Sequence, residues 1–209
     1  MRHRIGMSVL MMTLCLGLCA CAPAGSENKA EQLAMEIRGE YLSMTECQST
    51  VDITADYGQR VYEYSAQLTY TSGAEMVLTL TAPELVAGIS ARIQDGETTL
   101  EYDGIRVETG PLDEAGLSPV DAVPALLEYI KGGFIAECGM EETEEGGEQL
   151  RLICRDPEEE VGSGRECSLW FDPDSHALLG GEISQDGNVI VRCQFNAFHF
   201  SLPQENADP

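Results

Sequence analysis

The sequence predicts a mainly β fold of the α+β class: an incomplete antiparallel β-barrel (half-barrel) of about 10–11 strands, with helices covering the concave face. Three observations lead to this prediction. Short segments of alternating apolar and polar residues follow one another along most of the chain, as expected for strands with one buried face. Turns containing glycine or proline separate them at short intervals, which favours antiparallel pairing. Only two segments have helical periodicity, and no βαβ rhythm or internal repeat is present.

The first element is an amphipathic helix over residues 27–44. Its apolar residues recur every three to four positions among charged ones: Ala30, Leu33, Ile37, Tyr41 and Met44. Alternation then predicts strands near residues 47–55, 62–70 and 76–81. Shorter strands follow near residues 89–93, 100–102 and 105–107, and the Asp-Gly dipeptides at 95–96 and 103–104 suit tight hairpins.

A short helix over residues 124–131 interrupts the strands. Pro124 suits a first helical position, and Gly132-Gly133 ends the helix. Because proline inside a helix removes a backbone donor, one continuous helix from Pro119 is not expected. Strands resume near residues 134–140, 149–155, 165–171, 178–185 and 188–198. A sheet of this many strands tends to curl, and two helices are available to cover its apolar face.

The N-terminus has the organisation of an export signal. Residues 1–4 are basic, and the apolar run 5–20 is short for a transmembrane helix. The run ends in Leu18-Cys19-Ala20-Cys21, which resembles the lipobox of bacterial lipoproteins and predicts cleavage before Cys21 and lipidation of that cysteine. The alternative is an ordinary secretory signal with Cys21 incidental. We expect a signal peptide (1–20), a lipidated flexible tether (21–27), a half-barrel domain (28–203) and a disordered tail (204–209), in an extracytoplasmic protein held on the cell membrane by its lipid.

The charge of the chain argues against two kinds of partner. The formal net charge is −24, and removal of residues 1–20, which contain two arginines and no acidic residue, makes it −26. Nucleic acids and anionic bilayers attract clusters of Lys and Arg, which this sequence lacks. Attachment to the membrane is therefore expected to depend on the acyl chains on Cys21.

Five cysteines remain after removal of the signal peptide and lipidation of Cys21: Cys47, Cys138, Cys154, Cys167 and Cys193. The number is odd, and no Cys-x-x-Cys motif occurs among them. Each lies in a stretch of alternating polarity, where an unoxidised cysteine behaves as a small buried hydrophobe. We expect mostly reduced core thiols, although an exported protein can form disulfides and spacing alone does not establish pairing.

The sequence contains no motif that predicts catalysis. Gly-x-Ser-x-Gly, His-Glu-x-x-His and phosphate-binding glycine loops do not occur. His176 falls in a turn and His199 near the end of the last strand, and neither is expected to be catalytic or to bind metal. The acidic runs at 141–145 and 156–160 lack the spacing of a calcium loop and are typical of solvated loops. We therefore expect no enzyme activity, no metal and no cofactor.

One group of apolar residues is a candidate ligand-binding surface. Alternation places its members on the inner face of two strands, with one more on the second helix: Tyr62, Tyr64, Leu68, Met76, Leu78, Leu80 and Leu127. The simplest interpretation is a core beneath the first helix. The alternative is a cavity wall, because tyrosine and methionine line adaptable apolar pockets. Trp170 is out of phase with this face and is expected to point away from the core, at a partner surface or under a loop.

The order of elements resembles that of a known superfamily. The chain resembles the LolA/LolB-like lipoprotein carriers, and most of all the GerS-like germination lipoproteins. The resemblance rests on the order of its features: an export signal with a lipobox, an amphipathic helix, three long strands, Pro83-Glu84-Leu85 before Gly88-Ile89, the turn Tyr102-Asp103-Gly104, a short helix with proline and five further strands. The resemblance implies a half-barrel lidded by helices, whose apolar cavity accepts acyl chains in the carriers. It also implies an arginine near the lid, for which no matching residue is identified.

Two functions are compatible with these expectations. One is a non-enzymatic, membrane-anchored lipoprotein that binds a protein partner on the outer face of the membrane; the GerS-like resemblance suggests a cell-envelope or spore-germination factor. The other is a carrier or receptor for acyl chains of lipoproteins or other hydrophobic ligands. They differ in whether the concave face is open or is filled by helices.

Overall fold

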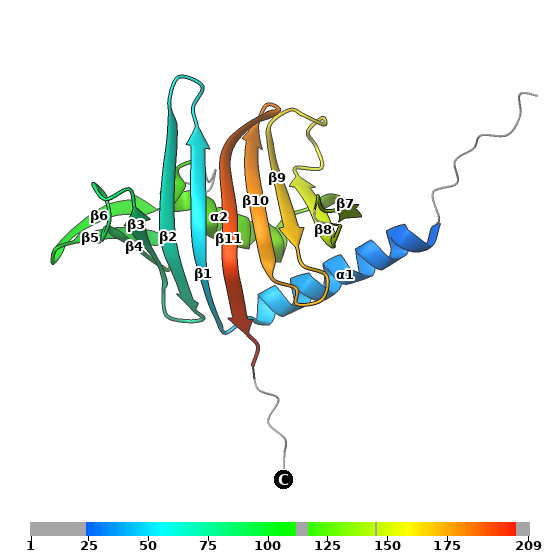
Figure 1. The fold of residues 1–209 in the computed structure, drawn as a ribbon, viewed down its shortest axis with the longest axis horizontal. Helices are drawn as coiled ribbons and strands as arrows, with labels where there is room; N and C mark the ends of the chain where they lie inside the picture. Colours follow the sequence, from blue (N-terminus) through cyan, green and yellow to red (C-terminus); the bar gives the residue numbers. More distant parts are fainter. Residues whose placement is uncertain (1–23, 112–116, 145, 204–209) are drawn as a thin grey trace, which may run out of the picture.

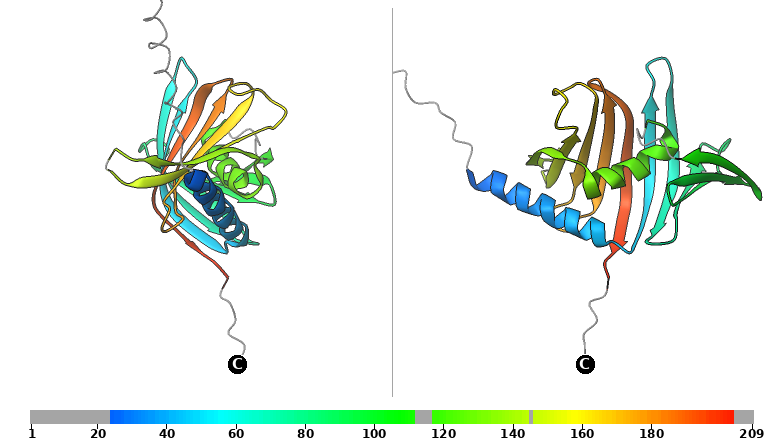
Figure 2. Two further views of the ribbon diagram at one scale, coloured as in Figure 1. Left: turned by 90° about the vertical axis from the view of Figure 1, so that its right-hand side faces the viewer. Right: turned by 180° about the vertical axis from the view of Figure 1, so that it is seen from behind.

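Segments of alternating polarity pair into one curved antiparallel sheet, and two helices lie on its concave face (Figure 1, Figure 2). The computed structural model describes residues 24–111, 117–144 and 146–203. In this part of the chain the sheet has eleven strands in the order β6-β5-β4-β3-β2-β1-β11-β10-β9-β8-β7, so the barrel is not closed. The fold class and strand number predicted from the sequence are confirmed. The strands are β1 (Glu46–Asp56), β2 (Val61–Thr71), β3 (Met76–Ala82), β4 (Ser90–Gln94), β5 (Glu97–Tyr102), β6 (Ile105–Pro111), β7 (Ile135–Glu142), β8 (Glu148–Arg155), β9 (Arg165–Phe171), β10 (Leu178–Gln185) and β11 (Asn188–Ser201).

Three Asp-Gly dipeptides form two-residue hairpin turns. Asp95, Asp103 and Asp186 have φ values of 52°, 49° and 50°, and the glycine that follows each also has a positive φ. Positive φ at both central residues gives a turn whose twist matches that of the flanking strands. These turns join β4 to β5, β5 to β6 and β10 to β11, and they set the register of the three pairs.

Helix α1 spans Ala24–Ser43 and begins three residues before the predicted range. Its buried residues follow helical spacing: Ala30, Ala34, Ile37 and Tyr41. The helix packs on β7, β8 and α2. The Tyr41 ring contacts those of Phe171 and Phe198, with centroid separations of 5.7 and 6.0 Å. This aromatic cluster attaches the C-terminal half of α1 to the core.

Helix α2 spans Pro119–Gly132, which is longer than the predicted helix. The Ser118 hydroxyl caps it by accepting from the backbone N–H of Asp121 at 3.2 Å. The expectation that Pro124 prevents a continuous helix from Pro119 is wrong. Pro124 removes one hydrogen bond near the start of the helix, and the buried residues on both sides of it compensate for that loss: Ala122, Val123, Ala125, Leu126, Leu127 and Ile130.

The core lies between α2 and the middle of the sheet. α2 packs on β1, β9, β10 and β11, where the inner side chains are almost inaccessible: Val51, Ile53, Leu169, Phe171, Ile183 and Val191. Four cysteines are buried in the same core: Cys47, Cys154, Cys167 and Cys193. None of the five cysteines in the described part of the chain takes part in a disulfide. Backbone hydrogen bonds and apolar packing therefore hold the sheet together without disulfides among these residues, in agreement with the predicted core thiols.

Candidate functional site on the concave face

The concave face has a filled part, which contains most of the predicted candidates. Leu68, Leu78 and Leu127 are at most 2 % exposed, and Met76 is 8 % exposed. In this structure they are core residues. The expectation that Leu68, Met76 and Leu78 lie beneath the first helix is wrong, because α1 lies between β7 and the start of β1, whereas α2 crosses the middle of the sheet (Figure 2).

The rest of the concave face is open. We call this surface the open half; its apolar residues come from β2, β3, β5 and β6: Tyr62, Tyr64, Leu80, Leu100, Tyr102, Ile105 and Val107. Ile105 is 66 % exposed, Tyr102 and Val107 are 54 % exposed, and Tyr62 is 37 % exposed. The described part of the chain therefore leaves Tyr102, Ile105 and Val107 more than half exposed, whereas Tyr64, Leu80 and Leu100 are partly buried against the core.

Strand register places the open half on the same face as the core. Leu78 is opposite Ala91, and Ala91 is opposite Leu100. Leu100 in turn is opposite Val107 on β6. Because residues opposite one another in an antiparallel pair point to the same face, the apolar surface continues from the buried Leu78 to the exposed edge strand.

Sequence reasoning named Tyr62, Tyr64 and Leu80 but missed the three most exposed residues of the open half. It predicted their strands near 100–102 and 105–107, and alternation alone places Tyr102 on the face of Leu100. The sequence did contain one indication that part of the concave face is exposed: its two predicted helices are too few to cover about ten strands.

An aromatic cluster borders the open half at the tip of the β1–β2 hairpin. The rings of Tyr62 and Tyr64 are stacked, with centroids 6.5 Å apart. Tyr57 contacts Tyr62 edge-on, and its hydroxyl donates to the carbonyl oxygen of Leu117 at 2.8 Å. Partial burial raises the pKa of Tyr57 above its ordinary value. The hairpin tip is thereby tied to the residues that precede α2.

A groove of about 460 Å³ separates α2 from the turns of β2–β5. Met76, Ile93 and Pro124 supply apolar lining, and Glu128 and Lys131 supply charge. The Lys131 ammonium lies 5.2 Å from the centroid of the Tyr70 ring and 3.3 Å from a carboxylate oxygen of Glu128. Of the predicted candidates, Met76 thus borders open space although it is mostly buried.

Arg38 joins the two helices at the end of α2. Its Nε donates to the carbonyl oxygen of Ile130 at 2.9 Å, and its Nη2 donates to that of Gly133 at 2.6 Å. The last carbonyls of a helix have no partner within the helix, and a cation there is favourable. Sequence reasoning identified no arginine with such a role, because the acceptors lie more than ninety residues away in the chain.

The two histidines in the described part of the chain lie on separate segments, the β9–β10 turn and β11. His176 is in the turn between β9 and β10, and its Nδ1 lies 2.7 Å from a carboxylate oxygen of Glu40 on α1. The Tyr41 hydroxyl donates to the His176 carbonyl oxygen at 3.1 Å. His199 is exposed on β11. The contacts of His176 therefore attach α1 to the β9–β10 turn.

Trp170 lies on the outer face of the sheet, as predicted, since Leu169 and Phe171 on either side are buried. Its indole Nε1 donates to Glu141 at 3.2 Å, and the Arg151 guanidinium lies 5.8 Å from the ring centroid. These two partners are on β7 and β8, so side chains of the neighbouring strands, rather than a loop, contact the ring.

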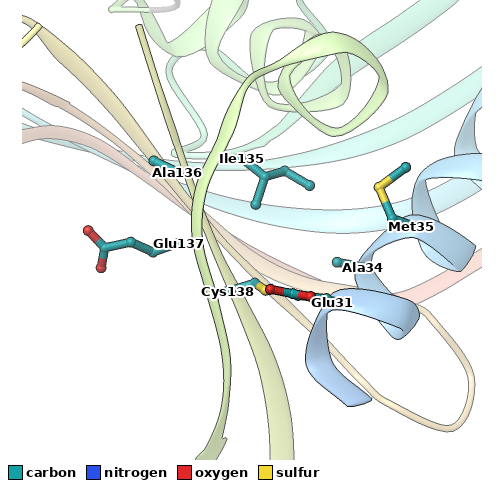
Figure 3. A pocket seen from close by; sticks show the side chains of 7 residues that line it. All are labelled: Glu31, Ala34, Met35, Ile135, Ala136, Glu137 and Cys138. Atoms are coloured by element: carbon teal, nitrogen blue, oxygen red, sulfur yellow. The ribbon is translucent and has the colours of Figure 1, made fainter. Parts of the chain in front are cut away.

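A second groove, of about 630 Å³, lies between α1 and the edge strand β7 (Figure 3). The helix contributes Glu31, Ala34 and Met35, and the strand contributes residues 135–138. Met35 is 60 % exposed at this groove. This surface is separate from the open half, which is at the opposite end of the sheet.

Comparison with known family models and with curated proteins gives no sequence match. Similar solved structures include an uncharacterized conserved protein from Thermus thermophilus, at 15 % identity and a TM-score of 0.50, over 84 % of this chain and 90 % of that chain. A LolA superfamily protein from Nitrosomonas europaea is similar at 10 % identity and a TM-score of 0.43, over 84 % of this chain and 96 % of that chain. A chain of the complex between the CwlD amidase and the GerS lipoprotein of Clostridioides difficile is similar at 13 % identity and a TM-score of 0.41. The similarity covers 82 % of this chain and 95 % of that chain.

These similarities concern the fold alone. The half-barrel predicted from the sequence is confirmed at that level, because the described residues form an open antiparallel sheet with helices in its concavity. The predicted signal peptide and Cys21 lie outside the described residues. Neither described helix combines the length and apolar character needed to span a bilayer.

Proposed function

We propose that this chain is a non-enzymatic lipoprotein, anchored on the outer face of the cell membrane through Cys21, that binds a protein partner with its open half. The observation that carries the proposal is the row formed by Tyr102, Ile105 and Val107, each more than half exposed on a concave apolar surface. Contiguous exposed apolar surface on a folded domain marks an interaction site.

The shape of the open half favours a protein over a small ligand. Small-molecule sites enclose most of the surface of their ligand. An acyl chain lying against Ile105 and Val107 would remain largely in water, because these side chains are themselves widely accessible. Tyr62, Tyr64 and Tyr102 have apolar rings with polar ends, a side chain that is enriched at protein interfaces.

The charge of the chain indicates the character of the partner. With a formal net charge of −24, the protein repels acidic surfaces and attracts basic ones. We therefore propose a partner with an apolar patch and a basic rim. The GerS-like resemblance suggests that it is a cell-envelope or spore-germination factor.

A carrier for acyl chains is the second candidate. The groove between α2 and β2–β5 favours it, because its volume of about 460 Å³ is in the range of ligand pockets. In that function Met76 and Ile93 would contact the chain, whereas Leu68, Leu78 and Leu127 would become accessible only after α2 moves.

Site-specific photocrosslinking in native membranes separates the two functions. A photoreactive amino acid replaces Ile105 in the full-length protein, and a matched control carries it at Val61, which is 56 % exposed and points to the outer face. We expect one dominant protein adduct from position 105, lost in a Tyr102→Asp background, and none from position 61. A lipid adduct from position 105 would support the carrier. Identical patterns from both positions would contradict both functions.

A further inference from the structure

The edge strand β7 has the features of an open pairing site. In the sheet formed by the described residues it pairs with β8 alone. Exposed edges of soluble proteins are usually protected by charged side chains, above all lysine, by proline or by a covering segment. β7, from Ile135 to Glu142, contains neither lysine nor proline, and its charged residues are all glutamates. Its outer edge is therefore suited to accept another strand through backbone hydrogen bonds.

Helix α1 provides a second wall beside this edge. Figures 1 and 2 show that the N-terminal part of α1 runs past β7, beyond the end of the sheet. The groove of about 630 Å³ lies where the helix passes the strand, and Figure 3 shows Met35 and Ile135 on its two sides. A strand added outside β7 would thus lie over α1. Its inward-pointing side chains would cover Met35, which is now 60 % exposed.

The charges at this edge select the added strand. Glu31, Glu137 and Glu142 are exposed along the groove and the strand. One Glu137 oxygen lies 3.1 Å from Arg155, and the other two carboxylates have no cation partner among the described residues. With its apolar side chains toward α1, an added strand would place lysine or arginine on the opposite face, to which Glu137 points (Figure 3).

A second copy of the chain does not fit this edge. Antiparallel pairing of two β7 strands about Gly139 would place Glu137 of one copy opposite Glu141 of the other, on both sides of the symmetry axis. Like charges directly opposite one another destabilise a strand pair, so this register is disfavoured. We therefore assign the site to a different chain.

We infer that β7 and α1 together form a docking site for an extended segment of a partner protein, in which apolar side chains alternate with basic ones. The segment continues the sheet by pairing with β7, and its apolar side chains lie against Met35 and Ile135. This site is independent of the open half and goes beyond the proposed function.

The test uses the full-length protein in phosphatidylcholine nanodiscs and an acetylated, amidated eight-residue peptide of alternating valine and lysine. One control peptide has glutamate in place of lysine. The other keeps the valine–lysine sequence and carries N-methyl groups on every backbone amide, which blocks strand pairing along both of its edges but not charge attraction. We expect saturable binding of the unmodified peptide, at least tenfold weaker binding of both controls, and hydrogen-exchange protection confined to residues 135–142 and to α1 near residue 35.

Two substitutions on α1 locate the site. Met35→Asp and Leu42→Asp each introduce one negative charge at an exposed apolar position of α1, and Leu42 is 63 % exposed. We expect Met35→Asp to weaken binding at least tenfold, despite the added negative charge, and Leu42→Asp and Ile105→Asp to leave it unchanged. The inference is overturned if the N-methylated peptide binds equally well, if protection appears at β6 instead of β7, or if Met35→Asp and Leu42→Asp have equal effects.

Discussion

Gly181 on β10 lies directly beneath Leu126 of α2, and a β-carbon on the glycine would come within 2.6 Å of a methyl carbon of that leucine. Leu126 is completely buried, so it has little room to turn away. The absence of a side chain at Gly181 is what allows α2 to approach the sheet so closely.

We expect Gly181→Ala to destabilise the domain by about 1–3 kcal/mol through overpacking. Gly180→Ala is the matched control, because its β-carbon would lie on the opposite face, 3.4 Å from the nearest described atom, the carbonyl oxygen of Cys193. Urea unfolding of both variants measures the difference. Equal shifts of the urea midpoint in the two variants would show that the close contact with Leu126 does not determine the loss of stability.

Arg38→Ala removes both hydrogen bonds that link α1 to the end of α2. Because the donor is charged and the acceptors are helix-terminal carbonyls, we expect a loss of about 1.5–3 kcal/mol. Hydrogen exchange should become faster near residues 129–133. Lys29→Ala removes an exposed cation from the same helix and should change neither quantity. Faster exchange in both variants would attribute the effect to net charge.

Tryptophan substitutions distinguish the filled part of the concave face from the open half. Leu78→Trp should overpack the core and cost about 1–3 kcal/mol, whereas Ile105→Trp should leave stability nearly unchanged. Thermal melts measure this difference, together with titration of the unmodified protein with a fluorescent fatty acid. Tight saturable binding that Leu78→Trp abolishes without altering the melt would favour the carrier over the partner-binding function.

The buried cysteines predict a loss of stability at alkaline pH. Burial raises the pKa of Cys154 to about 11 and that of Cys47 to about 12, whereas an unfolded thiol titrates near pH ~8.5. The folded state therefore keeps these thiols protonated. Their contribution is complete below pH ~8.5 and decreases as the pH rises toward 11.

Urea midpoints at pH 7.5, 9 and 10.5 in matched ionic strength measure this decrease. Thiol counting on the denatured, unreduced protein provides the control, with five thiols expected besides the lipidated cysteine. A count of one, which would require two disulfides, would contradict the structure as well as the pH prediction.

Cys21→Ala tests the anchor. The substitution removes the only cysteine that fits the lipobox-like sequence, so we expect the protein to leave the membrane fraction and to lose labelling by a fatty-acid analogue. Cys19→Ala is the control and should label normally. Equal labelling of Cys21→Ala would exclude lipidation at that position.

The sequence predicted the features of this fold that depend on neighbouring residues. The Asp-Gly turns at 95–96 and 103–104 and the alternation around Leu78 are local, and they are sufficient to predict hairpins and inner faces. The position of α2 is not local. It depends on contacts such as Gly181 with Leu126 and Arg38 with Gly133, between residues far apart in the chain. For the same reason Pro124 misled the helix prediction, since the burial that compensates for it comes from the sheet. The three most exposed residues of the open half were missed because their exposure depends on where α2 does not reach.

The side chain of Trp170 is the only indole in the protein, and its two partners are on β7 and β8. Fluorescence excited at wavelengths longer than those that tyrosine absorbs therefore comes from Trp170 alone, at one place on the outer face of the sheet. Detachment of β7 would remove the contact with Glu141 and expose the ring to solvent, which would move the emission to longer wavelength. The protein thus contains an optical sensor for this edge of the sheet, which reports on it without any added label.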